Sequence, residues 1–321
     1  MGKKKKPANF DIEKHTIFLG VYGSHAYGTS TPESDVDLRG ILIQPKRLLM
    51  SPFEEEFEQH EEKPEKDDAD VVIYELKKFV GLAVRANPSI FDLLYLPEDC
   101  IRTLTPFAEM LLDIRDAFLS IRAQETYIGY AVSQLQRIKR HRGWLLDPPK
   151  KKPERSDFGL TDKQVDFDAL KKAQQKVRDL GGDPMKVFGP EMDAERRYQT
   201  ALKHWQSYQQ WARSRNPARK ELEARWGYDT KHAMHLIRLL RMGWELVTTG
   251  QVNVRRPDAE ELLAIRTQGI WAYERLEEYL EEMTAKVDSF TGSPLPAVPD
   301  IKRIEERTIE IMERFWAHNG S

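Results

Sequence analysis

The sequence predicts an α+β protein in which a small mixed sheet in the N-terminal third precedes a helical remainder. Residues 16–22 form an apolar, β-prone run that ends at Gly23, which is typical of a buried strand. Residues 35–43 alternate well enough for a second strand. From Leu76 onward the apolar residues recur at helical spacing, so the sheet is expected to end before the chain becomes helical.

The other expected elements complete two domains. Residues 53–59 and 69–75 are expected to form a hairpin around the charged loop 61–68, and the proline-rich residues 147–153 must form a loop because proline breaks helices. The first expected helix begins at Leu76 and ends at Asn87-Pro88. Further helices are expected over residues 121–142, 166–180, 191–213, 228–249, 258–287 and 301–317. We therefore expect a first domain over residues 1–115 and a mostly helical, substrate-binding domain over residues 116–321.

Composition narrows the class of protein. The chain has 321 residues and a net charge of −2, but residues 54–70 are strongly acidic and residues 139–155 strongly basic. The single cysteine, Cys100, excludes intramolecular disulfides and multi-cysteine zinc sites. No apolar run approaches the roughly 20 residues that a membrane helix needs. We expect a cytoplasmic protein that does not associate with membranes, and no obligate protein partner is evident.

One segment combines residue types that suit a nucleoside triphosphate. Asp35 and Asp37 are separated by one residue, so on a strand both carboxylates point to the same face. Such a pair repels itself and needs a counter-charge, for which Mg²⁺ is the natural partner. Upstream, the turn at Gly23-Ser24 leads into a short helix and offers backbone N–H groups and a hydroxyl to a phosphate.

Gly23-Ser24 followed by Asp35-Val36-Asp37 resembles the signature of the polymerase-β-like nucleotidyltransferase superfamily. Residues 70–79, Asn87-Pro88 and residues 228–235 extend the resemblance to the predicted nucleotidyltransferases of RNA-repair pathways in bacteria and phages. The resemblance covers about residues 15 to 270. It implies a nucleotidyltransferase domain over residues 1–115.

The resemblance further implies a site of three carboxylates and two Mg²⁺ ions, with Mn²⁺ as a possible substitute. Asp35 and Asp37 would hold both metals, and a third acid would come from a neighbouring strand. Asp70 is the first choice because it opens the next β-prone run, and Glu75 is the alternative. The two lie on opposite faces of an ideal strand, so only one is expected to face the metals. Glu75 also fits the role of a helix N-terminal acid.

The helical part offers candidates for binding the nucleotide beside Gly23 and Ser24. Lys231, His235 and Arg238 fall within one narrow arc of the expected helix 228–249, which indicates either donors over the triphosphate or a solvated surface. Tyr130 belongs to a stripe at helical spacing that is either core or a surface for stacking a base. The run Lys150-Lys151-Lys152 is either a solvated loop or a track for an RNA backbone.

These observations favour a magnesium-dependent enzyme of the EC 2.7.7 type. It would move a nucleoside monophosphate from a triphosphate such as ATP to a hydroxyl and release pyrophosphate. An RNA 3′ end is the favoured acceptor, as in RNA repair. One alternative is transfer to a protein or small-molecule hydroxyl, and another is a non-catalytic module that binds nucleotide or RNA.

Overall fold

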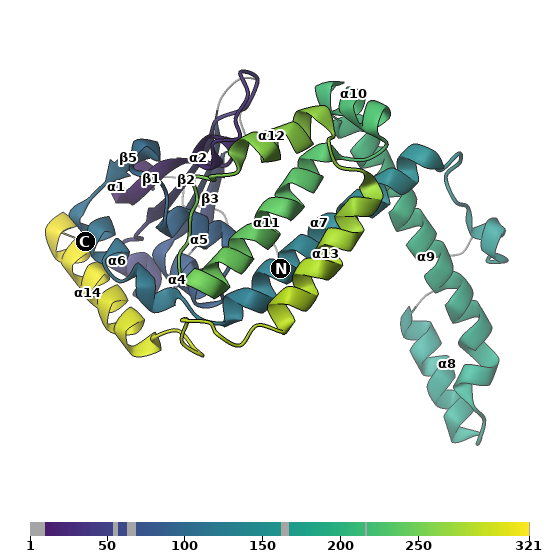
Figure 1. Cartoon of the computed structure of the whole chain (residues 1–321). Coiled ribbons are helices and arrows are strands. Elements are labelled where there is room, and N and C mark those ends of the chain that lie inside the picture. The colour runs from purple at the N-terminus through teal and green to yellow at the C-terminus, as the bar shows by residue number, and fades with distance from the viewer. Residues whose placement is uncertain (1–9, 54–56, 63–68, 162–166, 216, 321) are drawn as a thin grey trace. The chain divides into compact units, whose positions relative to one another are not determined.

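The computed structural model describes residues 10–53, 57–62, 69–161, 167–215 and 217–320. The chain divides into two compact units (Figure 1). The sheet unit comprises Met1–Ile138 and Thr230–Ser321, and the helical unit comprises Lys139–Asp229. The C-terminal helices therefore belong with the sheet. A functional division into residues 1–115 and 116–321 stays a prediction.

The sheet has five strands in the order β3-β4-β2-β1-β5. They are β1 (Thr16–Tyr22), β2 (Asp37–Leu42), β3 (Gln59–Glu62), β4 (Asp70–Glu75) and β5 (Ile101–Leu104). β2 and β4 are parallel and the other neighbours are antiparallel, so the predicted mixed sheet is confirmed. The expected hairpin is present as β3 and β4, but β3 lies later than the predicted residues 53–59. Part of the predicted loop, residues 63–68, lies outside the described residues, as do residues 54–56.

Helices surround this sheet and form most of the remaining chain. In the sheet unit they are α1 (Ile12–His15), α2 (Ser24–Tyr27), α3 (Lys46–Met50), α4 (Leu76–Val84), α5 (Pro88–Leu94), α6 (Pro106–Leu112), α11 (Thr230–Thr249), α12 (Ala259–Gln268), α13 (Tyr273–Asp288) and α14 (Ile301–Asn319), with the short turns η1 (Glu98–Cys100) and η2 (Arg115–Phe118). Helix α7 (Arg122–Leu146) begins in the sheet unit and ends in the helical unit, which also contains η3 (Arg155–Phe158), α8 (Phe167–Asp179), α9 (Pro184–Ser214) and α10 (Pro217–Trp226).

Two predicted helices differ in extent for local reasons. The predicted helix 258–287 is two helices, α12 and α13, because Gly269 adopts a left-handed conformation (φ 55°) that ends α12. The predicted helix 191–213 begins earlier, at Pro184, where the Asp183 side chain accepts a hydrogen bond from the N–H of Met185 and so caps α9. No helix in the described part of the chain is long and apolar enough to cross a membrane.

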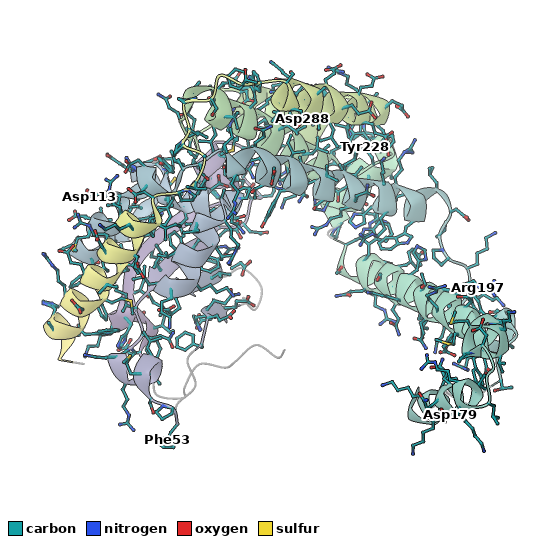
Figure 2. All side chains as sticks on the ribbon, turned by 90° about the horizontal axis from the view of Figure 1, so that it is seen from below. Phe53, Asp113, Asp179, Arg197, Tyr228 and Asp288 are labelled. Atoms are coloured by element: carbon teal, nitrogen blue, oxygen red, sulfur yellow. The ribbon has the colours of Figure 1, made fainter. Side chains whose placement is uncertain are left out.

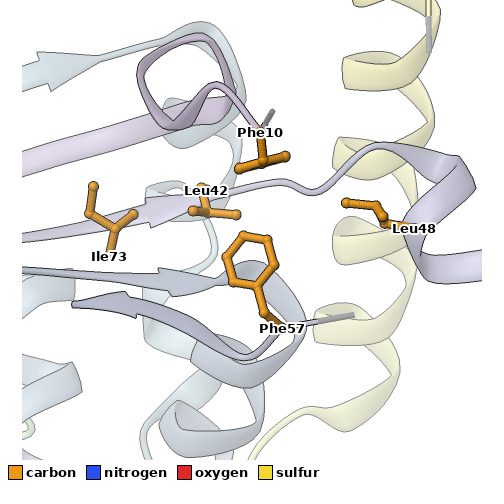
Figure 3. Packing of buried hydrophobic residues seen from close by; sticks show 5 residues of the cluster. All are labelled: Phe10, Leu42, Leu48, Phe57 and Ile73. Carbon is orange, nitrogen blue, oxygen red and sulfur yellow. The ribbon is translucent and has the colours of Figure 1, made fainter. Parts of the chain in front are cut away.

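Alternation along β2 and β4 separates a core face from a polar face. Leu42 and Ile73 point to one side, where they pack with Phe10, Leu48 and Phe57 (Figure 3). Asp37 of β2 and Asp70 of β4 have the opposite parity, so they point to the other face. The carboxylates therefore point away from this cluster, on the face that also carries Arg39 and the buried Ile41.

Candidate active site

A row of polar side chains crosses the sheet from β1 to β4. Tyr22 pairs with Asp37 across the antiparallel strands β1 and β2, and Asp37 pairs with Asp70 across the parallel strands β2 and β4. Directly opposite residues on neighbouring strands share a face and have Cβ atoms roughly 5 Å apart. The strand pairing therefore places Asp70, the predicted third acid, beside Asp37.

Asp35 lies two residues before this row and outside the strand. It is exposed, because β2 begins only at Asp37 and not at Asp35 as predicted. Burial raises the pKa of Asp37, Arg39 and Lys231 lower it, and Asp70 and Asp35 raise it. All three predicted carboxylates are thus close enough to interact electrostatically, and their mutual repulsion is the condition that a cation relieves.

Arg39 supplies a counter-charge from within the sheet. It is two residues after Asp37 and so shares its face. Its Nη2 atom lies 3.8 Å from Oδ1 of Asp37 and 3.4 Å from Oδ2 of Asp70, and its Nη1 donates to the Asp70 carbonyl at 2.9 Å. The guanidinium carbon lies 5.6 Å from the centre of the Tyr22 ring. Arg39 was not among the residues predicted for the site. Its spacing of two residues from Asp37 would have indicated that both side chains share one face of a strand.

Glu75, the alternative third acid, lies at the other end of β4. It pairs with Leu42, five residues along from the Asp37–Asp70 pair, which corresponds to about 16 Å on a strand. Its side chain is buried and accepts hydrogen bonds from the N–H groups of Lys77 and Lys78, at 2.7 and 3.3 Å. Glu75 therefore caps α4, and the structure does not bring it to the other carboxylates.

The two acids are expected to respond differently to substitution. Asp70→Asn should lower nucleotidyl transfer at least about a hundredfold, since a lost metal contact costs several kcal/mol, while changing stability by less than about 1 kcal/mol. Glu75→Ala should cost roughly 1–2 kcal/mol of unfolding free energy through the lost cap and leave the rate per folded molecule unchanged. Transfer rates and urea unfolding of both variants check this pair, and a rate loss in Glu75→Ala alone would reverse the choice of third acid.

Gly23 and Ser24 form a turn beside Asp37, at one point of this row. Gly23 adopts φ 72° and ψ −137°, a backbone conformation open essentially to glycine alone. A Cβ atom at Gly23 would lie only 2.7 Å from Oδ2 of Asp37, so the missing side chain makes room for this carboxylate. Ser24 begins α2, whose first N–H groups have no acceptor within the helix. The turn therefore presents a hydroxyl and N–H groups beside Asp37.

Helix α11 contributes only part of the predicted cationic arc. Lys231 is half-buried and lies close enough to Asp37 to lower the pKa of that carboxyl. His235, one turn later, is also half-buried. Arg238 departs from the prediction of an exposed donor, because it is only 6% exposed and packs into the core. The arc was an incomplete guide since neighbouring elements cover α11 on more than one side.

Arg238 belongs to a buried cluster beneath the turn. Its Nη1 atom lies 3.4 Å from Oδ2 of Asp92 in α5, and its guanidinium carbon lies 3.8 Å from the centre of the Tyr27 ring. The hydroxyls of Tyr27 and Tyr22 donate to the same Asp92 oxygen at 2.6 and 3.2 Å. Burial raises the pKa of both tyrosines, so both stay protonated and donate. The cluster ties α2, β1, α5 and α11 together.

Tyr130 of α7 is exposed and contacts the residue that caps α5. Its hydroxyl accepts a hydrogen bond from Nδ2 of Asn87 at 2.8 Å, and 38% of its surface is exposed. Burial raises the pKa of Tyr74, Arg39 lowers it, and Glu61 and Tyr130 raise it. Tyr74 shares the Asp70 face of β4 and interacts electrostatically with Tyr130. Tyr127, in contrast, is core.

Comparison with known proteins finds one matching family and two similar proteins that we describe. Residues 5–146 match the model of the RNA repair pathway DNA polymerase beta family. An uncharacterized 38.9 kDa protein encoded in the nrdC–mobD intergenic region of Enterobacteria phage T4 is 27% identical over 301 residues, which cover 85% of this chain and 89% of the phage protein. A nucleotidyltransferase-like protein from Exiguobacterium sibiricum is 11% identical over 95% of this chain and 86% of its own, with a TM-score of 0.21.

The resemblance drawn from the sequence is therefore confirmed over residues 5–146. The family match spans the Gly-Ser turn, the row of carboxylates and the whole of α7. Together with the mixed sheet and the helices that follow it, this match points to a polymerase-β-like nucleotidyltransferase.

Proposed function

We propose that this chain transfers a nucleoside monophosphate from a nucleoside triphosphate to a hydroxyl group, with an RNA 3′ end as the acceptor and pyrophosphate as the second product. The observation that carries the proposal is the pairing of Asp37 with Asp70 across β2 and β4, beside Asp35 and beneath the Gly23 turn. The description of the matching family, which names an RNA repair pathway, supports RNA as the acceptor.

The chemistry of the donor set fits Mg²⁺. Hard divalent cations prefer carboxylate oxygens, and Asp35, Asp37 and Asp70 offer such oxygens close together. Arg39 and Lys231 already lower the pKa of Asp37. The missing Cβ at Gly23 lets the turn approach Oδ2 of Asp37 closely, so its N–H groups and this carboxylate lie side by side. Asp35, Asp37 and Asp70 would hold the metal. When bound, magnesium at these carboxylates supplies positive charge at the attacking hydroxyl and at the leaving pyrophosphate.

The remaining groups of the site bind and orient the substrate. The Ser24 hydroxyl and the N–H groups at the start of α2 would bind the triphosphate, and Lys231 would add a positive charge from α11. His235, also on α11, stays a candidate for binding the triphosphate. Arg238 would act indirectly, because its ion pair with Asp92 and its contact with Tyr27 hold α2 in place.

Tyr130 is the candidate for stacking the base of the nucleotide. We expect Tyr130→Ala to raise the KM for the triphosphate about tenfold or more, since stacking of a base on an aromatic ring contributes roughly 1–3 kcal/mol. Tyr130→Phe keeps the ring and loses only the hydrogen bond from Asn87, so it should keep the KM close to that of the wild type. Steady-state kinetics on both variants tests this role, which an unchanged KM in Tyr130→Ala would rule out.

The reaction type is tested with triphosphates labelled on either the α- or the γ-phosphate. The protein is incubated with each, with Mg²⁺ and with a short single-stranded RNA. Nucleotidyl transfer places the α-label on RNA and the γ-label in pyrophosphate, whereas a phosphotransferase would place the γ-label on the acceptor. Asp35→Ala should lose both signals. The same labels found on a protein or small molecule, and never on RNA, would replace the proposed acceptor.

A further inference from the structure

The helical unit has a charge opposite to that of the rest of the chain. Residues 139–229 contain 21 lysines and arginines against 14 aspartates and glutamates, a net charge of +7. The other residues contain 29 against 38, a net charge of −9. The overall charge of −2 therefore conceals one strongly basic part, which is the electrostatic condition for binding a polyanion.

Buried ion pairs inside this unit leave the exposed charge positive. Glu195 is buried and paired with Arg155 at 2.8 Å, and Glu223 is buried and paired with Arg215. The opposite charges of each pair cancel, so these pairs add no net charge to the surface of the unit. The exposed cations are carried by the end of α7, the loop after it and α9, and they include Arg140, Lys150, Lys152, Arg196, Arg197 and Lys203.

Two of these arginines line a hollow that also has aromatic walls. The hollow has a volume of about 590 Å³ and is lined by Phe158, Arg196, Arg197, Thr200, Ala201 and His204. Arg196 and Arg197 also line a second hollow of about 680 Å³ on α9 (Figure 2 labels Arg197). Both arginines are exposed, and Arg196 also pairs with Asp193 one turn away.

The hollow is held by contacts between η3 and α9. Nη1 of Arg155 donates to Oε1 of Glu195 at 3.0 Å, and the Phe158 and Tyr198 rings lie 5.8 Å apart. The loop that carries Lys150 and Lys152 leads directly into η3, so its exposed lysines are anchored close in sequence to the hollow. The cationic loop therefore precedes the element that carries Phe158 by only a few residues.

This combination matches the chemistry of a single nucleic-acid strand. Guanidinium groups bind phosphates with two parallel hydrogen bonds, and aromatic and imidazole rings stack on bases that are not paired. An acidic protein would meet the positive charge but would not require the aromatic walls. The described residues therefore favour a single nucleic-acid strand as the occupant, and the proposed function makes that strand RNA.

We propose that the helical unit binds the RNA acceptor, with the hollow between Phe158 and His204 taking a base and Arg196 and Arg197 taking the adjoining phosphates. The proposal rests on the proposed function and identifies the surface that holds its acceptor. The basic loop at Lys150 and Lys152 extends the same track along the RNA backbone.

The test measures RNA affinity in the absence of catalysis. Fluorescence anisotropy of a labelled single-stranded RNA is recorded with the full chain, without triphosphate and with a chelator, at several salt concentrations. The double variant Arg196→Ala/Arg197→Ala should weaken binding roughly tenfold and reduce the slope of log affinity against log salt by about 1.4, since each phosphate contact on a single strand contributes about 0.7. Phe158→Ala should weaken binding with little change of slope.

The matched control is Lys302→Ala/Arg314→Ala, which removes two exposed cations from α14 of the sheet unit and should leave both affinity and slope unchanged. Equal weakening in the control, or none in the Arg196/Arg197 variant, would overturn the proposal. The nucleotidyl transfer assay is run separately, on the wild type. Transfer by the wild type together with unchanged RNA binding by the variant would refute this surface alone, whereas RNA binding without transfer would refute the proposed function.

Discussion

Asp37→Asn is expected to reduce nucleotidyl transfer about a thousandfold or more without unfolding the protein. Asp37 is the one acid that adjoins all the others, because it pairs with Asp70, follows Asp35 and lies beneath Gly23. The amide has nearly the same shape but cannot offer a negative charge to a cation. Metal-ion catalysis contributes several kcal/mol, and each 1.4 kcal/mol corresponds to a factor of ten in rate.

The measurement is the single-turnover rate at saturating triphosphate, together with the urea midpoint of the variant. Asp288→Asn is the matched control, because it makes the same chemical change at an exposed residue that ends α13. The control should keep the wild-type rate. A rate for Asp37→Asn within tenfold of the wild type would remove Asp37 from the catalytic site.

Asp92→Ala is expected to cause the largest loss of stability, about 3–5 kcal/mol. Asp92 is 1% exposed and is the shared acceptor of Tyr22, Tyr27 and Arg238. Burial by itself would lower the pKa of Arg238, but Tyr27 and Asp92 raise it above its ordinary value, so the guanidinium stays charged. Removing Asp92 leaves that charge buried without its carboxylate, which is the costly way to break a buried ion pair.

Urea unfolding measures this loss, and Asp116→Ala is the control. Asp116 pairs with Arg303 at 2.9 Å, but both side chains are largely exposed, so this pair should contribute no more than about 1 kcal/mol. If the two variants lose similar stability, the cluster is not what holds α2 against α5 and α11. A fall in triphosphate affinity in Asp92→Asn, with the fold retained, would show the positioning role directly.

The sequence predicted the carboxylates better than it predicted their surroundings. The spacing of Asp35 and Asp37 and the apolar run before Gly23 are features of neighbouring residues, so they can be recognised without knowing the fold. Asp37 lies beside Asp70 because β2 and β4 pair in parallel, and this pairing cannot be predicted from a single sequence. The short strand β5 was missed because four residues, with alternate ones exposed, carry little periodic signal.

The helical part shows why a periodic arc can mislead. Lys231, His235 and Arg238 fall on one side of α11, yet only the first two remain partly accessible. Arg238 is buried because Asp92 and Tyr27, which are distant in sequence, accept its charge inside the protein. The single charged residue of helix α5, Asp92, was the signal that such a partner existed. Arg238 was expected to contact the substrate, but in the structure it is buried and paired with Asp92.

The most direct test of the account is the mass of a short single-stranded RNA after incubation with the four nucleoside triphosphates and Mg²⁺. The wild-type protein should increase that mass by one or more nucleoside monophosphates at the 3′ end, and Asp37→Asn should leave it unchanged over the same time. Equal mass gain with both proteins would show that the row of Tyr22, Asp37 and Asp70 is not the active site. No mass gain with the wild type would contradict RNA as the acceptor.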